Sequence, residues 1–74
     1  MFEERYKCTG NRIRYYRKQM DMEQVDFAQE VGITPQYLSK IECGCAKPSL
    51  DLLFLIAKCL NVDIVELIKD TDNL

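Results

Sequence analysis

The sequence predicts an all-α fold, a compact arrangement of five short helices. Apolar residues recur at spacings of three and four in successive segments, which is the repeat of a helix with one buried side. Capping and helix-breaking residues such as Gly32, Thr34, Pro35 and Ser49 separate these segments. Apolar residues make up 47% of the 74 residues, which supports one small core near the lower size limit for a stable domain.

The first helix is predicted from about Thr9 to Met20. Within it, Ile13, Tyr16 and Met20 repeat at the spacing of a buried stripe. The charged and aromatic residues before Thr9 either extend this helix backward or fray, as chain termini often do.

The whole chain, residues 1–74, is predicted to be one domain. Its core spans about residues 9–69, between the segment 1–8 and a short acidic tail, 70–74, which is expected to be disordered.

Two short helices joined by a tight turn are predicted next, over about residues 24–31 and 35–42. Gly32 supplies the left-handed backbone that ends a helix, and Thr34 can cap the helix that follows. Pro35 suits a first helical turn because that turn has no N–H to lose. A helix, a glycine turn and a second helix of this size form the helix-turn-helix arrangement, which places its second helix in a DNA major groove.

The helix at 35–42 has two different sides. Thr34, Leu38 and Ile41 fall within one arc and Tyr37 lies at its edge, whereas the polar residues Gln36, Ser39, Lys40 and Cys43 face the other way. A glutamine can bond adenine in two places, and a lysine can reach guanine acceptors. The pattern therefore favours base reading by Gln36 and Lys40, although the same side chains also suit a solvated surface helix.

The last two helices are unusually apolar. Ser49 is expected to cap a helix that runs to about Leu60, and Asp63 with Glu66 forms a capping-box pattern for the final one. Apolar residues cover nearly the full circumference of both helices, so part of this surface is expected to pair with a second copy. The predicted dimer residues are Leu52, Leu55, Cys59, Val65 and Ile68. The alternative is that both strips pack inside one subunit.

Charge is distributed unevenly along the chain. The net charge is −2, yet residues 1–20 carry +4, while residues 21–47 and 48–74 each carry −3. Because phosphate contacts supply much of the affinity for DNA, this balance predicts weak and strongly salt-sensitive binding by a single subunit.

The sequence offers little support for catalysis or cofactor binding. It has no histidine, no glycine-rich phosphate loop and no recognisable catalytic carboxylate pair, so we expect no enzyme activity and no cofactor. The four cysteines include one C-x-C pair, Cys43 and Cys45, whose spacing is a weak zinc signal. Four free thiols and no metal are expected, and a metal or redox-sensing role is the weaker alternative. No segment suggests a membrane span or an export leader, which predicts a cytoplasmic protein.

Residues 10–70 resemble the Cro-repressor or Xre-type family of helix-turn-helix regulators. The matching residues are Arg12, Ile13, Arg14, Arg17, Lys18, Gln24, Phe27, Ala28, Val31, Gly32, Leu38 to Glu42, Gly44, Pro48 to Leu50, Ile56, Ala57 and Leu60. The resemblance implies a lambda-repressor-like domain that binds double-stranded DNA. The dimer predicted from the apolar last helices would match a palindromic operator.

The same resemblance implies roles for individual residues. Base contacts are expected from Thr34, Gln36, Tyr37 and Lys40, contacts to the DNA backbone from Gln24, Cys43 and Lys47, and a partly buried ion pair between Arg17 and Glu42.

Several positions depart from the family pattern. Relatives usually have glycine where Asp21 stands and a Ser, Thr or Asn cap where Glu23 stands. They also often carry basic or amide side chains at Cys43, Cys45 and Ala46. The depleted basic loop leaves a second hypothesis open, in which the fold is mainly a protein-interaction module such as the antitoxin of a toxin pair.

Overall fold

The structure, a computed structural model, describes the backbone of residues 2–69 and the side chains of residues 8–69. Its helices are α1 (Phe2–Gln19), α2 (Gln24–Val31), α3 (Pro35–Glu42), α4 (Leu50–Leu60) and α5 (Ile64–Ile68). Residues 2–69 contain no strand, so the predicted all-α fold with five helices is confirmed over this range.

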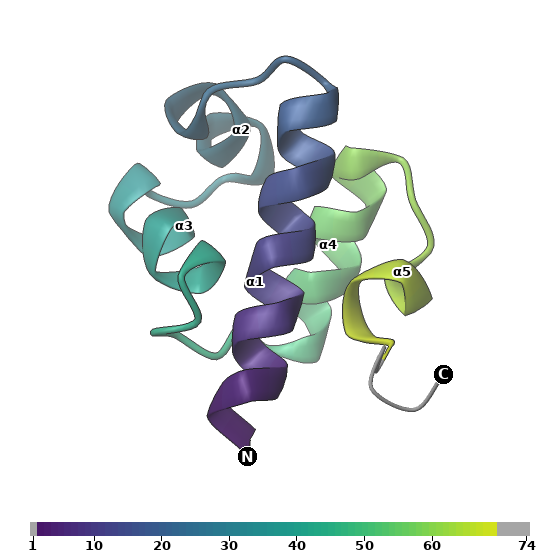
Figure 1. Cartoon of the computed structure of the whole chain (residues 1–74). Helices are drawn as coiled ribbons and strands as arrows, with labels where there is room; N and C mark the ends of the chain where they lie inside the picture. Colours follow the sequence, from purple (N-terminus) through teal and green to yellow (C-terminus); the bar gives the residue numbers. More distant parts are fainter. Residues whose placement is uncertain (1, 70–74) are drawn as a thin grey trace.

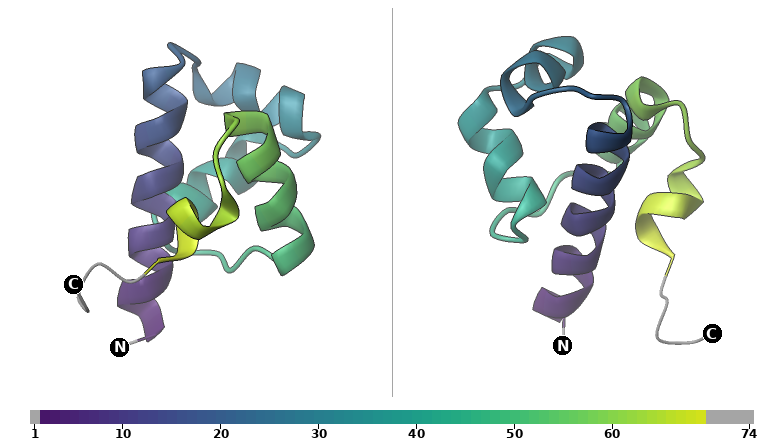
Figure 2. Two further views of the ribbon diagram at one scale, coloured as in Figure 1. Left: turned by 90° about the vertical axis from the view of Figure 1, so that its right-hand side faces the viewer. Right: turned by 45° about the horizontal axis from the view of Figure 1, so that its top comes forward.

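Helix α1 is the longest element and lies at the centre of the molecule (Figure 1). Helices α2 and α3 lie on one side of it, and α5 lies on the opposite side in both Figure 1 and the right-hand view of Figure 2. Helix α1 contacts α3, α4 and α5, and α4 also packs against α2 and α5. The buried apolar core therefore draws on all five helices: Ile13, Phe27, Ala28, Val31, Leu38, Ile41, Ile56, Ala57, Leu60 and Leu67.

The first helix differs from its predicted bounds at both ends. It begins at Phe2, so residues 2–8 continue the helix, while Met1 and the predicted tail 70–74 lie outside the described residues. At the other end, the prediction that Met20 belongs to the buried stripe is wrong, because Met20 is 43% exposed. Met20 lies directly after the last residue of the helix, Gln19, and the chain turns through Asp21 at a φ of 58° immediately beyond it.

The turn between α2 and α3 has the predicted capping contacts. Gly32 adopts a φ of 94°, and its N–H donates to the Ala28 carbonyl at 2.8 Å. The Thr34 hydroxyl accepts from the Tyr37 N–H at 3.1 Å, and Pro35 is the first residue of α3. These contacts fix where α3 begins and thus which of its side chains face outward.

The starts of α4 and α5 are capped differently. The Ser49 hydroxyl accepts from the Leu52 N–H at 3.1 Å, as predicted for α4. The predicted capping box of α5 is wrong, because Asp63 occupies the N-cap position without a side-chain cap bond. The Glu66 carboxylate instead accepts from the Tyr16 hydroxyl at 3.3 Å and pairs with Lys69 at 3.1 Å, and so it joins α5 to α1.

Candidate nucleic-acid interface

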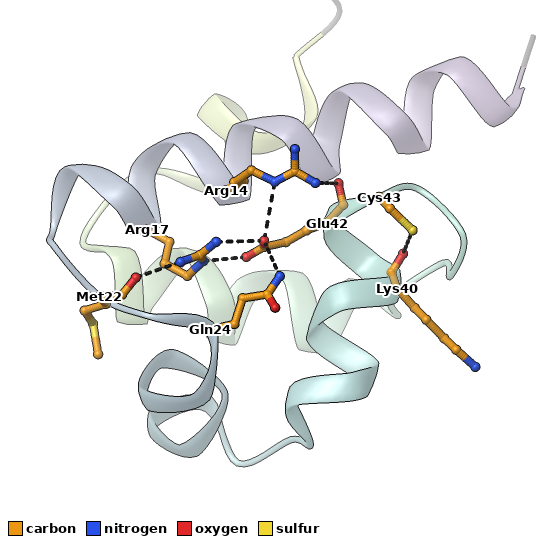
Figure 3. A network of polar contacts seen from close by, with 7 residues as sticks. All are labelled: Arg14, Arg17, Met22, Gln24, Lys40, Glu42 and Cys43. Carbon is orange, nitrogen blue, oxygen red and sulfur yellow. Dashed lines mark hydrogen bonds and ion pairs between the residues drawn. The ribbon is translucent and has the colours of Figure 1, made fainter.

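The outward side of α3 is polar and accessible. Gln36, Ser39 and Lys40 are exposed, whereas Leu38 and Ile41 are almost completely buried beneath them. Figure 3 shows the Lys40 side chain pointing away from the body of the protein. The predicted division of the helix into two sides is thus confirmed for these five residues.

Thr34 and Tyr37 lie at the start of α3 and differ in exposure. Thr34 was predicted to share the arc of Leu38 and Ile41, but it is exposed, because its hydroxyl caps the helix from outside. Tyr37 is half-buried and packs against the core, in keeping with its predicted place at the edge. Both residues lie next to Gln36 along the rim of the exposed face.

The last turn of α3 is held from beneath by the Arg17 and Glu42 ion pair. Arg17 Nε lies 2.7 Å from Glu42 Oε2, and Arg17 Nη2 lies 3.0 Å from Glu42 Oε1, which gives a two-point fork. Glu42 is completely buried and Arg17 is 5% exposed. The third guanidinium nitrogen, Nη1, donates to the Met22 carbonyl at 2.7 Å and so ties down the chain after α1 as well.

Two further side chains join this ion pair, and Figure 3 shows all four together. Gln24 Nε2 donates to Glu42 Oε1 at 3.0 Å, and Arg14 Nε lies 3.6 Å from the same oxygen. The ion pair was predicted, but the contributions of Gln24 and Arg14 were not. Arg14 precedes Arg17 by three residues, so their shared face on α1 was the available signal.

Gly10 lets α1 approach α3 closely. A Cβ at this position would lie 2.5 Å from the Glu42 carbonyl oxygen and still nearer to that of Ile41. These are backbone atoms at the end of a helix, so they have little freedom to move aside. Gly10 and the ion pair together fix the distance and angle of α3 relative to α1.

The loop after α3 is hydrogen-bonded to α3 through one backbone carbonyl, that of Lys40. The Lys40 carbonyl accepts from the N–H groups of Cys45 at 2.8 Å and Ala46 at 3.1 Å, and the Cys43 thiol contacts it at 3.4 Å. The Cys43 and Cys45 sulfurs are hydrogen-bonded at 2.7 Å. This contact is the main cause that lowers the pKa of Cys43, and the charge of Arg14 lowers it further. Lys47 is exposed in the same loop.

The three arginines of α1 whose side chains are described are directed to two different places. Arg14 and Arg17 are directed to Glu42, whereas Arg12 donates to the Lys69 carbonyl beyond the end of α5. Among the described side chains, Lys40 on the exposed face of α3, Lys47 in the loop after it and the partly exposed Arg14 carry positive charge in this region.

The five predicted dimer residues divide into two groups. Leu55, Val65 and Ile68 are exposed, whereas Leu52 and Cys59 are half-buried and pack against the core of their own subunit. Burial also raises the pKa of Cys59. Leu50 and Phe54, which are not in the predicted dimer set, are also exposed, at 59% and 53%.

Comparison with known proteins connects this architecture to a family. A family model described as helix-turn-helix matches residues 13–67. An uncharacterized HTH-type transcriptional regulator of Methanocaldococcus jannaschii is 39% identical over 57 residues, which cover 77% of this chain and 86% of the relative. The antitoxin PezA of Streptococcus pneumoniae is 36% identical over 61 residues, but the match covers only 39% of its length against 82% of this chain.

A solved structure agrees with these sequence matches. The restriction-modification controller protein C.AhdI of Aeromonas hydrophila superimposes with a TM-score of 0.82 at 25% identity, over 88% of this chain and 94% of that protein. The fold and the exposed polar helix define a helix-turn-helix DNA-binding protein. The chain belongs to the Xre-type family of helix-turn-helix transcriptional regulators. None of its described helices is long and apolar enough to cross a membrane.

Proposed function

We propose that this protein is a sequence-specific regulator that binds a palindromic operator as a dimer, with α3 in the major groove. The observation that carries the proposal is the contrast between the two sides of α3. A buried ion pair and a glycine contact hold the helix from beneath, while Gln36, Ser39 and Lys40 are exposed on its other side. A rigidly held helix with accessible donors and acceptors suits the reading of base edges.

Seven residues on and around α3 have proposed roles. Gln36 and Lys40 read base edges, while Thr34 and Tyr37 contact bases or the adjoining sugar-phosphate rim. Gln24, Cys43 and Lys47 contact the DNA backbone. Gln24 lies at the start of α2, where the helix dipole favours a phosphate, and its bond to Glu42 orients the amide.

The dimer is proposed to form through the exposed apolar residues of α4 and α5. Leu55, Val65 and Ile68 remain from the predicted set, and Leu50 and Phe54 extend the apolar surface along α4. Exposed apolar side chains in such number on two short neighbouring helices favour burial against an identical surface. Two-fold pairing would place the recognition helices about 34 Å apart, one turn of DNA.

Selection of bound sites from random double-stranded DNA tests the proposal. We expect a palindrome whose half-sites are centred about 10 base pairs apart. Recovery of a single unrepeated half-site would contradict the dimer, and the absence of any enriched sequence would contradict sequence-specific binding.

Sedimentation of a matched pair of variants tests the dimer surface separately. Val65 and Val25 are each the second residue of their helix, α5 and α2, and they are 56% and 60% exposed. Val65→Glu should convert the dimer to monomer, whereas Val25→Glu should leave the dimer intact. If both variants sediment at the same rate as the unsubstituted protein, this interface is contradicted.

A second candidate function is that of a protein-binding antitoxin. The similarity to PezA and the exposed apolar residues of α4 and α5 favour it. Failure of the purified protein to shift any DNA at low salt would support this alternative over the regulator.

A further inference from the structure

The two exposed cysteines at the end of α3 lie close together, and their pairing has no role in the regulator described above, in which only Cys43 is proposed to contact the DNA backbone. Cys43 is the C-cap residue of α3 and Cys45 follows after Gly44, which turns the backbone at a φ of 83°. This turn brings the two sulfurs to 2.7 Å, and both thiols are exposed. Only a small further approach separates them from a disulfide, whose sulfurs lie about 2.05 Å apart.

We propose that Cys43 and Cys45 form a reversible oxidation site, at which a hydroperoxide converts the two thiols into an intramolecular disulfide. The other two cysteines differ from them in ways that favour this pair. Cys8 lies on α1, and Cys59 is half-buried against the core. Neither of these residues has a sulfur partner among the contacts of the described side chains.

The oxidation balances in two steps. The Cys43 thiolate attacks the peroxide, an S–O bond forms as the O–O bond breaks, and the departing oxygen takes a proton, which leaves a sulfenic acid on Cys43. The Cys45 thiol then loses its proton and attacks the Cys43 sulfur, so that an S–S bond forms and water leaves. In total, two electrons pass from the two thiols to the peroxide. A dithiol reductant restores both thiols by thiol–disulfide exchange. The lowered pKa of Cys43 favours it as the attacking group.

Disulfide formation changes the segment that adjoins the exposed face of α3. It removes the contact of the Cys43 thiol with the Lys40 carbonyl, and it constrains a loop whose N–H groups bond to that same carbonyl. Cys43 and Lys47, which are proposed to contact the DNA backbone, lie in this loop. Oxidation is therefore expected to weaken DNA binding by about tenfold, the scale of one lost contact to a charged group. This consequence rests on the proposed function.

Peptide mapping tests the disulfide without any reference to DNA. Trypsin spares the bond between Lys47 and Pro48, so the peptide Ile41–Lys58 carries Cys43 and Cys45 and no other cysteine. After treatment with hydrogen peroxide and then with N-ethylmaleimide, this peptide should be unalkylated and about 2 Da lighter than its dithiol form. The peptides Cys8–Arg12 and Cys59–Lys69 should both be alkylated. Two alkylated thiols in Ile41–Lys58, or pairing of either thiol with Cys8 or Cys59, would overturn the proposal.

DNA affinity tests the regulatory consequence, with the operator obtained by site selection. Peroxide should weaken binding by the unsubstituted protein and by Cys8→Ser, and a dithiol should reverse this loss in both. Cys45→Ser, which cannot form the disulfide, should lose less affinity than Cys8→Ser under the same peroxide treatment. A disulfide that leaves affinity unchanged would overturn the regulatory consequence and leave the modification site standing. If the disulfide forms in a protein that binds no DNA in either state, the proposed function fails while the thiol chemistry holds.

Discussion

Arg17 on α1 and Glu42 at the last residue of α3 are joined by two hydrogen bonds in an almost fully buried setting. Glu42 also accepts from Gln24 and lies near Arg14, so its carboxylate has three donor side chains around it. A buried pair of this kind contributes little net stability compared with apolar residues, but it specifies one orientation. Its main effect here is to fix the direction of α3.

Removal of one partner should therefore cost more than removal of both. Glu42→Leu leaves the buried Arg17 guanidinium without its acceptor and should lower the free energy of unfolding by about 3–5 kcal/mol. Arg17→Met should cost less, because Gln24 and Arg14 still reach the carboxylate. The double variant Arg17→Met, Glu42→Leu should recover part of the loss. Urea unfolding of all three variants measures this cycle, and purely additive losses would contradict the coupling.

Gly10→Ala should destabilise the protein even though alanine favours helices. The added methyl would collide with the carbonyl oxygens of Ile41 and Glu42, and such overpacking costs about 1–3 kcal/mol. Asn11→Ala, at the next and exposed position of α1, is the matched control and should be neutral or slightly stabilising. Thermal unfolding measures both, and an unchanged melting temperature for Gly10→Ala would show that α1 and α3 separate easily.

Gln36→Ala should weaken binding to the selected operator by about 1–3 kcal/mol and relax the preference at one base pair. Gln29→Ala, which replaces an exposed glutamine on α2, provides the control for a lost surface amide. Titration of the operator and of single-base variants measures both properties. An equal loss on every sequence would show that Gln36 contacts the backbone and does not read bases.

Glu23→Ser should stabilise the protein by about 1 kcal/mol, because Glu23 is the N-cap of α2 and makes no side-chain cap bond. A serine hydroxyl at this position can accept a hydrogen bond from one of the unpaired N–H groups of the first turn. Glu30→Ser removes the same charge from the exposed side of α2 without supplying a cap, and it should be neutral or destabilising. Equal effects of the two substitutions in urea unfolding would indicate a charge effect.

Acid should weaken the contact between α5 and α1 through Glu66. Its pKa is lowered below the ordinary 4.5, first by the hydrogen bond and charge of Lys69 and also by the Tyr16 hydroxyl. A lowered folded-state pKa means that the carboxylate stabilises the fold above the unfolded value and that this stabilisation is lost as the pH falls through the folded value. Glu66→Gln should therefore show a smaller loss of stability on acidification below pH 4.5 than Glu30→Gln. If the stability of Glu66→Gln and of Glu30→Gln fell equally with pH, the proposed contribution of the Glu66 carboxylate would be contradicted.

The sequence predicted those features that depend on local pattern. The helix-turn-helix bounds follow from Gly32, Thr34 and Pro35, whose conformations are set by their own backbone. The left-handed conformation of Asp21 and the missing cap at Glu23 agree with the two departures from the family pattern.

Features that depend on tertiary contacts were harder to predict. The Gln24 bond to Glu42 and the close approach at Gly10 arise only when α1 and α2 meet α3 in space. Which apolar residues of α4 remain exposed depends on the angle at which it packs, so helical periodicity alone did not single out Leu50 and Phe54 as exposed. The roles of Gln36, Lys40 and the proposed dimer residues stay predictions.

The position of α1 between α3 and α5 has a consequence for operator architecture. Because α3, the proposed recognition helix, and α5, part of the proposed dimer surface, both pack against α1, the protein would set the distance between the two recognition helices of the proposed dimer. One additional base pair between the half-sites would displace the second target by about 3.4 Å and turn it by about a tenth of a revolution. Such a dimer would discriminate between operators by the spacing of their half-sites as well as by their base sequence.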